Sequence, residues 1–315
     1  MAEQVAGPSQ SDVGQRVSIR IQLGQGEGFQ DLLGLLESPT SIRKKDGTVQ
    51  NFDPHSIAAW RIVQPVSSKA GTGKPTSLRI AELESAAEKS WPALSTFERG
   101  GWRYRISEGF TFRANSILPI GRPPLGEPQL ELSAELEYAV EAFREKGITP
   151  AIHVPLPTYL ELDNALADAG WSVAVEAHLM IADRVDVPTP PLPDEFTFHC
   201  EGSLSDSWLE IQGNSPGVRI MAGYPAHYLS ISQGAENIAA ARIAVADGWA
   251  IISRIFIKEE FRGQGLSRAL LGQAAHVSGA EKIALQVDIT NSRAISLYSS
   301  SGFRVHHNYR FRVTT

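Results

Sequence analysis

The stretch "FRGQGLSRALL" (Phe261–Leu271) follows a strand-like segment and leads into residues whose apolar spacing is helical. Gly263 and Gly265 lie in the turn between them, where glycine can adopt conformations that other residues avoid. The first amides of a helix have no partner within the helix and together carry about half a positive charge. The turn therefore predicts an anion site, most simply for a phosphate. Taken alone, it is equally compatible with a purely structural turn.

A second motif, "NSRAISLYSSSGF", begins about twenty-five residues further on. Together, the two motifs resemble the GNAT acetyltransferase superfamily, whose pyrophosphate loop reads Arg or Gln, two residues, Gly, one residue, then Gly or Ala. In this chain Ser267 takes the last position, a small departure that a tight turn should admit. The second motif matches the superfamily pattern Asn-x-x-Ala-x-x-Leu-Tyr-x-x-x-Gly-Phe at Asn291, Ala294, Leu297, Tyr298, Gly302 and Phe303.

The resemblance implies a mixed α/β fold, binding of acetyl-coenzyme A and transfer of its acetyl group to an amine. It also implies that backbone groups of the strand before the loop pair with the pantetheine arm, and that loop amides hold the pyrophosphate. Asn291 would hydrogen-bond the pantetheine or β-alanine portion, and Tyr298 would protonate the departing thiolate. The implied cofactor-binding residues are Ile255, Phe256, Ile257, Arg262, Gly263, Gln264, Gly265, Leu266, Ser267, Arg268 and Asn291.

The residue chemistry is compatible with these roles. A thiol has a pKa of about 8.5 and a tyrosine phenol about 10, so a phenol remains protonated at pH 7 and can donate to the sulfur. The alternative for Tyr298 is an aromatic side chain packed one turn before a helix end. The alternative for Asn291 is a helix N-cap, which is compatible with cofactor binding as well.

The base that would deprotonate the amine is not evident. Many relatives carry a glutamate on the strand before the loop, where this chain has Phe256. Asp288 ends the next strand and is one candidate. His306 and His307 are adjacent in a strand, so at most one of them faces the site. A water relay or a weakly basic amine would remove the need for any of them.

The chain of 315 residues is long enough for two or three domains. Alternating apolar residues and an Asp-Gly turn near its start predict a small all-β unit, which we expect to be an SH3-like barrel. Strands and helices then alternate to the end, interrupted by a proline-rich segment. The predicted parts are a disordered tail (1–11), an SH3-like β-barrel (12–64), a linker (65–77), a degenerate GNAT-like unit (78–186), a second linker (187–194) and an acetyl-CoA-binding GNAT domain (195–315).

The last two units resemble each other. "LDNALADAGWSV" lies over "AISLYSSSGFRV", which places Gly170 on Gly302 and Trp171 on Phe303. The strands "AIHV" and "ALQV" also match when they are shifted by one residue. We therefore expect two copies of one unit, as in bacterial tandem GNAT proteins. The first copy carries "RPPLGEPQLEL" in place of the glycine loop, and its prolines predict that only the second copy holds the ligand.

Two other glycine segments do not support a phosphate site. "GTGK" in the first linker lacks the first glycine and the final Ser or Thr of a Walker A loop, at Ser68 and Pro75. "GQGEG" (24–28) connects strands, with no helix after it. Both predict loops.

Composition limits the remaining possibilities. The net charge of −6 argues against general nucleic-acid binding, and the chain has no long apolar run of membrane-spanning length. The single cysteine, Cys200, excludes an intrachain disulfide and sites built from several thiolates, and no metal-ligand cluster is apparent. The N-terminus does not resemble a signal peptide, so the expected location is cytoplasmic.

The sequence thus predicts an acetyl-CoA-dependent N-acetyltransferase that acts by direct attack of an amine, with Tyr298 as general acid. The acceptor is a small-molecule or protein amine, and no nucleic acid or membrane is involved. The candidates for the acceptor pocket between the copies are Arg113, Asn115, Trp102 and His153, and the alternative for each is a structural role. The alternative is a non-catalytic acyl-CoA sensor or recruitment module, which could engage a partner through the N-terminal barrel.

Overall fold

The computed structural model describes residues 7–24, 28–44, 47–62, 76–213 and 217–315. The chain divides into two compact units, residues 1–68 and 69–315. The predicted linker (65–77) falls almost entirely outside the described residues, as do residues 1–6 of the predicted tail and the centre of the 24–28 loop. The end of that tail is ordered, because Gln10–Asp12 form a short 3-10 helix and Pro8 is buried.

The first unit contains one antiparallel sheet with strand order β4-β3-β2-β1-β5. The alternation predicted for its first strand is present, since Val17 and Ile19 are fully buried and Arg20 faces solvent, paired with Asp31. This antiparallel sheet around one apolar cluster is consistent with a small barrel-like domain. Its strands are β1 (Arg16–Gln22), β2 (Phe29–Ser38), β3 (Ser41–Arg43), β4 (Val49–Asn51) and β5 (Ile57–Ile62).

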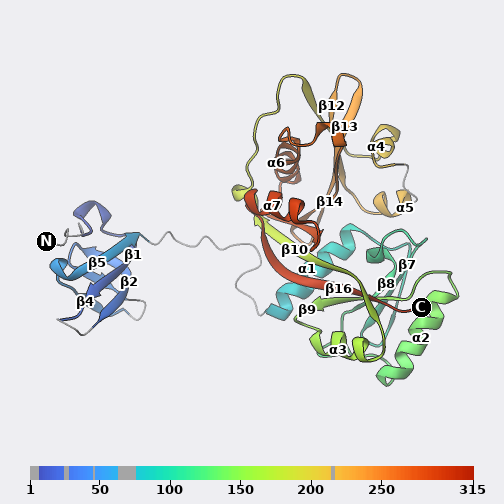
Figure 1. Cartoon of the computed structure of the whole chain (residues 1–315), viewed down its shortest axis with the longest axis horizontal. Helices are drawn as coiled ribbons and strands as arrows, with labels where there is room; N and C mark the ends of the chain where they lie inside the picture. The colour runs from blue at the N-terminus through green and yellow to red at the C-terminus, as the bar shows by residue number, and fades with distance from the viewer. Residues whose placement is uncertain (1–6, 25–27, 45–46, 63–75, 214–216) are drawn as a thin grey trace. The chain divides into compact units, whose positions relative to one another are not determined.

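The second unit is built on one mixed sheet of eleven strands in the order β11-β12-β13-β14-β15-β10-β16-β9-β8-β7-β6. Figure 1 shows β10 and β16 crossing the middle of this unit, between the part that carries α6 and the part that carries α2. The strands are β6 (Ser95–Arg99), β7 (Trp102–Ile106), β8 (Ser116–Pro119), β9 (Ala151–Leu156), β10 (Ser172–Asp183), β11 (Phe196–Glu201), β12 (His227–Gln233), β13 (Glu236–Ala246), β14 (Trp249–Ile257), β15 (Lys282–Asp288) and β16 (Arg304–Val313).

Helices pack on this sheet. Among the described residues, no helix is both long and apolar enough to cross a membrane.

The sequence pattern did not identify the short strand β6 or the helix α5. The helices are α1 (Thr76–Ser90), α2 (Leu132–Arg144), α3 (Leu160–Asp168), α4 (Asp206–Ile211), α5 (Val218–Met221), α6 (Leu266–Ser278) and α7 (Ser292–Ser300).

The predicted repeat is visible as two copies of one strand-helix arrangement. The order β8-α2-β9-α3-β10 in the first half corresponds to β14-α6-β15-α7-β16 in the second, and in each half the first two of these strands are parallel. The matched helices also end alike, because the amide of Trp171 donates to Leu166 O and that of Phe303 to Tyr298 O. The predicted internal repeat is therefore confirmed.

The two halves exchange their last strands. Strand β10 of the first half pairs with β15 of the second, and β16 of the second half pairs with β9 of the first. Strands β10 and β16 pair with each other antiparallel at the centre. Neither half can complete its sheet alone, so the halves form a single folded body.

The register of the central ladder obeys the repeat. When Gly170 is laid on Gly302, exchanging the two halves converts the Val175–Phe311 pair into the Leu179–His307 pair and leaves the Ala177–Tyr309 pair in place. The irregularities in this ladder, one on each side of the Ala177–Tyr309 pair, are exchanged in the same way. The local twofold relation thus passes through that pair.

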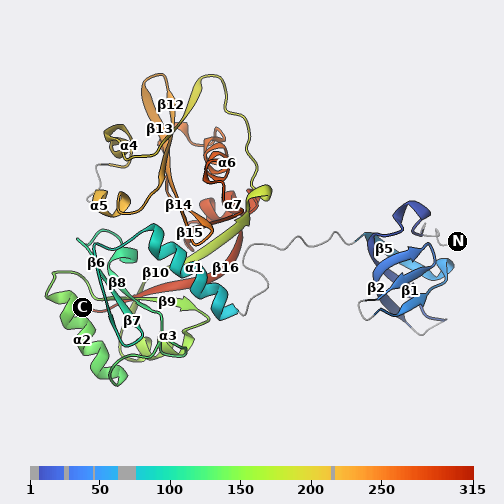
Figure 2. The same ribbon diagram turned by 180° about the vertical axis from the view of Figure 1, so that it is seen from behind.

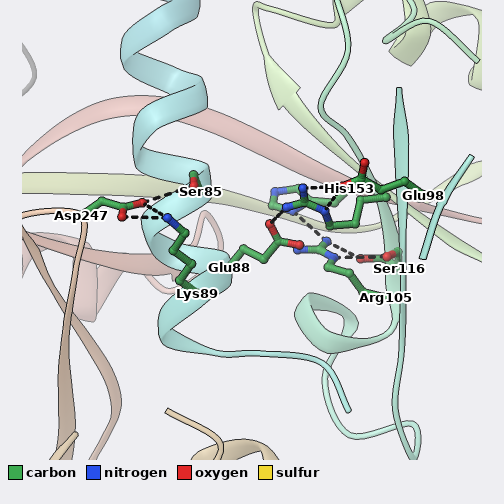
Figure 3. A network of polar contacts seen from close by, with 9 residues as sticks. Ser85, Glu88, Lys89, Glu98, Arg105, Ser116, His153 and Asp247 are labelled. Atoms are coloured by element: carbon green, nitrogen blue, oxygen red, sulfur yellow. Dashed lines mark hydrogen bonds and ion pairs between the residues drawn. The ribbon is translucent and has the colours of Figure 1, made fainter. Parts of the chain in front are cut away.

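Helix α1 contacts both halves, and Figure 2 shows it near the middle of the unit, seen from behind. It packs on β13 and β14 of the second half. Figure 3 shows Lys89 and Ser85 directed toward Asp247, in the turn between β13 and β14. Glu88 points to the other side, where it pairs with Arg103 of the first half at 2.6 Å.

Candidate active site

The glycine loop lies between β14 and α6, as predicted. Gly263 and Gly265 have φ angles of 85° and 80°, in the left-handed region that favours glycine. Gly265 is the N-cap of α6 and provides no side chain to cap it. The first amides of α6 are therefore available to a ligand, and the helix dipole favours an anion there.

The space above this loop is open. A Cβ atom placed on Gly263 or on Gly265 would meet no heavy atom within 4 Å. These glycines are thus required for their backbone conformation and not for tight packing within the chain. The loop is held from both sides, because Arg262 Nε donates to Ile257 O at 3.3 Å and Arg268 Nη2 donates to Ser300 Oγ at 2.8 Å.

The second motif forms the opposite wall. Asn291 is the N-cap of α7, where its Oδ1 accepts a hydrogen bond of 3.0 Å from the Ala294 amide. The cap uses only this oxygen, so the side-chain NH2 group of Asn291 can donate to a ligand. Tyr298 lies two turns further along α7 and is 8% exposed, in the apolar core beside Phe303. Burial raises the pKa of Tyr298 to about 12, so its phenol is protonated at neutral pH.

Both motifs line one cavity of about 520 Å³. Its lining includes three arginines and, among the described residues, no acidic side chain, so the cavity favours anionic ligands. Gln264 is the one predicted binding residue that does not line it. The predicted residues that do are Ile255, Phe256, Ile257, Arg262, Gly263, Gly265, Leu266, Ser267, Arg268, Asn291 and Tyr298.

Strand β14 offers its edge to this cavity. Its parallel pairing with β15 runs from Trp249 to Ile252 and then stops, so the two strands diverge. On its other side, β14 remains paired with β13 as far as Ile257. Backbone groups near Ile255–Ile257 are therefore free of a β15 partner, which is the arrangement expected for strand-like pairing with an extended ligand.

Arg293 also lines the cavity and was not among the predicted residues. It stands one residue from Ala294 in the first turn of α7, at a position that the second motif leaves variable. The signal available in the sequence was its positive charge within the second motif, which forms α7. Phe261 and Leu297 complete the apolar part of the lining.

The base candidates are not brought to the cavity. Asp288 accepts hydrogen bonds from the hydroxyl and the amide of Thr290, which lower its pKa and weaken it as a base. His307 is buried against Glu84 at 2.8 Å, and His306 contacts His307. Phe256, at the place of the superfamily glutamate, lines the cavity without a titratable group. Among the described lining residues none is a carboxylate or an imidazole.

Of the four acceptor-pocket candidates only Arg113 lines a cavity between the halves. Asn115 instead holds a turn together, accepting from the Ser107 amide and donating to Thr111 O. Trp102 is buried and donates to Leu125 O. His153 is buried beside Arg105 and Glu84. The polar groups of these three residues therefore contact neighbouring protein groups and do not line a cavity between the halves.

Residues 76–312, which contain the cavity, match the sequence family described as "Probable histone acetyltransferase Rv0428c C-terminal". This match covers well over half of the chain. The chain belongs to this GNAT acetyltransferase family. Within the described residues of this GNAT protein, no group of three or more His, Cys, Asp or Glu side chains could hold a metal ion.

Two curated relatives extend this assignment. YobR of Bacillus subtilis (strain 168), described as an uncharacterized N-acetyltransferase, is 31% identical over 251 residues, covering 74% of the GNAT chain and 98% of YobR. The probable histone acetyltransferase Rv0428c of Mycobacterium tuberculosis (strain ATCC 25618 / H37Rv) is 27% identical over 317 residues. That alignment covers 95% of this chain and 94% of the relative, so it extends over the first unit as well.

Solved structures share the fold. A GCN5-related N-acetyltransferase from Kribbella flavida matches with a TM-score of 0.61 at 17% identity, covering 74% of this chain and 95% of that one. A tandem GNAT protein from the clavulanic acid biosynthesis pathway matches with a TM-score of 0.52 at 13% identity, covering 79% and 90%. The predicted GNAT fold in tandem form is thus confirmed.

Proposed function

We propose that this protein transfers an acetyl group from acetyl-CoA directly to an acceptor amine. The observation that supports this most strongly is the cavity of about 520 Å³, which is lined by an uncapped helix N-terminus, three guanidinium groups and a protonated Tyr298. Acetyl-CoA, when bound, supplies the activated thioester. The description of the mycobacterial relative names a histone as acceptor, and that acceptor is stated for the relative alone.

The residues present fit the donor. The amides at the start of α6 and the side chains of Arg262, Arg268 and Arg293 would hold the pyrophosphate. The open space above Gly263 and Gly265 allows close approach to the backbone. Asn291 would donate its amide NH2 to the pantetheine portion while its oxygen caps α7.

Tyr298 would act as the general acid. The amine nitrogen forms a bond with the acetyl carbon, the carbon–sulfur bond breaks, and the phenol proton passes to the departing sulfur. The phenol is then reprotonated by solvent, and the proton lost by the amine also passes to solvent. The structure shows no hydrogen bond to the Tyr298 hydroxyl from the described residues, so this group is available to the ligand.

The test is calorimetry of the full chain with acetyl-CoA, followed by thiol release with a panel of amines. We expect binding that weakens as salt increases. Replacing the cavity arginines together (Arg262→Gln, Arg268→Gln, Arg293→Gln) should reduce the affinity, whereas Arg219→Gln should not. Arg219 is exposed, pairs with Glu108 and lies outside the cavity. Absence of acetyl-CoA binding would refute the proposal.

The alternative of a non-catalytic acyl-CoA sensor has one supporting observation, the lack of a carboxylate or imidazole among the described lining residues. Binding of acetyl-CoA with no thiol release for any amine would support this sensor over the enzyme.

A further inference from the structure

A second cavity, of about 340 Å³, lies between the two halves. Its volume is near the lower end of the range for small-molecule sites, which is roughly 300–1,000 Å³. Strand β14 contributes Ile251–Arg254 to this cavity and Ile255–Ile257 to the first one. Consecutive residues of one strand therefore line both cavities, and the first half supplies much of the remaining wall.

The second cavity lies where β14 and β15 diverge. Their last pair is Ile252 with Leu285, and the next residues, Ser253 and Gln286, both line the cavity. Arg254 follows with a φ of 57° beside an irregularity in the β13–β14 ladder. Strained conformations of this kind cost about 1–3 kcal/mol and concentrate at ligand sites.

Polar atoms at this divergence are buried without partners. No described residue forms a hydrogen bond with Ser253 Oγ, with Arg254 Nε or with the amide Nε2 and Oε1 atoms of Gln286. Buried polar groups are rarely left unsatisfied, because each costs about 1–3 kcal/mol. A ligand with both hydrogen-bond donors and acceptors would satisfy this group, since Gln286 can both donate and accept.

The charge of the second cavity has one sign. Arg113 and Arg254 are its charged residues, and the described lining holds no acidic side chain. Arg113 forms no hydrogen bond or ion pair with the described residues, and its guanidinium carbon lies 5.8 Å from the centre of the Trp91 ring. Arg254 also contacts a ring, that of Phe110, at 5.6 Å. Both guanidinium groups thus lack a carboxylate partner.

The rest of the second cavity is apolar. Phe112 and Phe311 stack with their ring centres 5.4 Å apart, one from each half. Trp91, Val175 and Ile251 also contribute to the lining. Apolar walls with a few convergent polar groups are typical of small-molecule sites.

We propose that the second cavity binds the acceptor, and that this acceptor is a small amine with a carboxylate and an apolar side group, such as an apolar α-amino acid. The inference rests on the proposed function. The carboxylate pairs with Arg113 or Arg254, and the apolar group packs between the aromatic rings. Arg254 Nη2 donates to Gln212 O, a neutral partner, so neither guanidinium charge is compensated by a carboxylate among the described residues. Basic acceptors, such as polyamines or lysine-rich peptides, are repelled because they would bring additional positive charge to these two groups.

This charge pattern also bears on the missing base. Neighbouring positive charges and burial both lower the pKa of an ammonium group. The acceptor therefore loses its proton to water more easily in this cavity than in solution. The neutral amine then attacks the acetyl carbon with the bond changes described above.

The test measures thiol release by the full chain with acetyl-CoA and each apolar α-amino acid, beside the corresponding amide. Rates are compared per neutral amine, because an amide derivative has a different amine pKa. We expect kcat/KM to be at least about tenfold higher for the acids, as a charge-assisted hydrogen bond is lost in the amides. Spermidine and a lysine-rich peptide should be poorer still.

Variants identify the recognising group. Arg113→Gln should raise KM for the acids by about tenfold, leave KM for the amides and the acetyl-CoA Kd unchanged, and be partly rescued by Arg113→Lys. The matched control is Arg122→Gln, whose side chain is 90% exposed and lies outside both cavities. An unaltered acid-to-amide ratio in Arg113→Gln would refute the role of Arg113.

The remaining outcomes separate the two proposals. Better turnover of spermidine or the lysine-rich peptide than of any acid would refute the acceptor assignment, and so would acetyl-CoA binding without turnover of any acid. Absence of acetyl-CoA binding would instead refute the proposed function.

Discussion

The two halves of the second unit share one arrangement of strands and helices, but they differ where a ligand would bind. In the second half β14 ends at Ile257 and α6 begins at Leu266, with an open glycine turn before it. In the first half β8 ends at Pro119 and α2 begins only at Leu132. The intervening loop folds back on its own half, because Gly126 packs against Pro119 and Trp102.

The helix after the next strand differs as well. The overlay that places Gly170 on Gly302 places Leu166 at the position of Tyr298 and Tyr159 at that of Asn291. Leu166 is fully buried, and the Tyr159 hydroxyl donates to Gly121 O within the folded-back loop. The exchanged strands thus require both copies of the fold, whereas the open glycine turn is present in the second copy alone among the two described loops.

The largest expected effect separates the two tyrosines. Tyr298→Phe should lower kcat by about 10²–10⁴-fold because the general acid is lost, while the acetyl-CoA Kd stays within about twofold. Tyr159→Phe removes a hydroxyl from the other half and should cost about 1 kcal/mol of stability without loss of turnover. Thiol release and calorimetry on both variants check this. Equal activity of Tyr298→Phe and the native chain would contradict the acid role.

The next effect concerns the contact between α1 and the exchanged strand β16. Burial would raise the pKa of Glu84, but its neighbours His153, His307 and Arg105 hold it at about 2, below the usual value of 4.5. The unfolded chain then binds a proton more readily than the folded one, so this carboxylate stabilises the fold above about pH 4.5. That contribution is lost as the pH falls from 4.5 toward 2.

Urea unfolding between pH 7 and pH 3 tests this contribution. Glu84→Gln should lower the free energy of unfolding at pH 7 and show a shallower loss of stability in acid than the native chain. Glu88→Gln, on the same helix but paired with Arg103, serves as the control. A parallel pH dependence in Glu84→Gln and the native chain would contradict the assignment.

Glycine substitutions compare the two loops directly. Gly265→Ala should weaken acetyl-CoA binding by about tenfold, since alanine in the left-handed conformation costs about 1–2 kcal/mol and the helix start would shift. Gly126→Ala would place its Cβ 2.6 Å from the Pro119 Cβ, so it should lower Tm without changing the Kd. Calorimetry and thermal unfolding measure the two effects. A reversal, with Gly126→Ala affecting the Kd, would indicate that the first loop also binds ligand.

The smallest effect is expected at the outer contact of α1. Lys89 pairs with Asp247 at 2.8 Å, but their side chains are 53% and 36% exposed (Figure 3). Exposed ion pairs of this kind contribute about 0–1 kcal/mol and are screened by salt. Lys89→Met should therefore change the urea midpoint only slightly, and high salt should abolish the difference. A change above about 2 kcal/mol would show that this pair is essential to the contact between the halves.

Sequence reasoning was most successful where a function depends on neighbouring residues. The spacing from Arg262 to Arg268 and from Asn291 to Phe303 predicted the superfamily, and the structure brings both segments to one cavity. It was less successful for isolated polar residues, as with Asn115 and His153, which have partners within the first half.

By itself, the sequence determined the tandem α/β fold, the location of the glycine loop and the loss of that loop from the first half. Glycine, proline and apolar spacing act on the backbone locally, so a linear pattern carries that information. Only the tertiary structure decided that β10 and β16 are exchanged, and that Arg113, Gln286 and Phe311 meet in one cavity. Strand partners and the satisfaction of buried polar atoms depend on segments far apart in the chain, which local patterns do not specify.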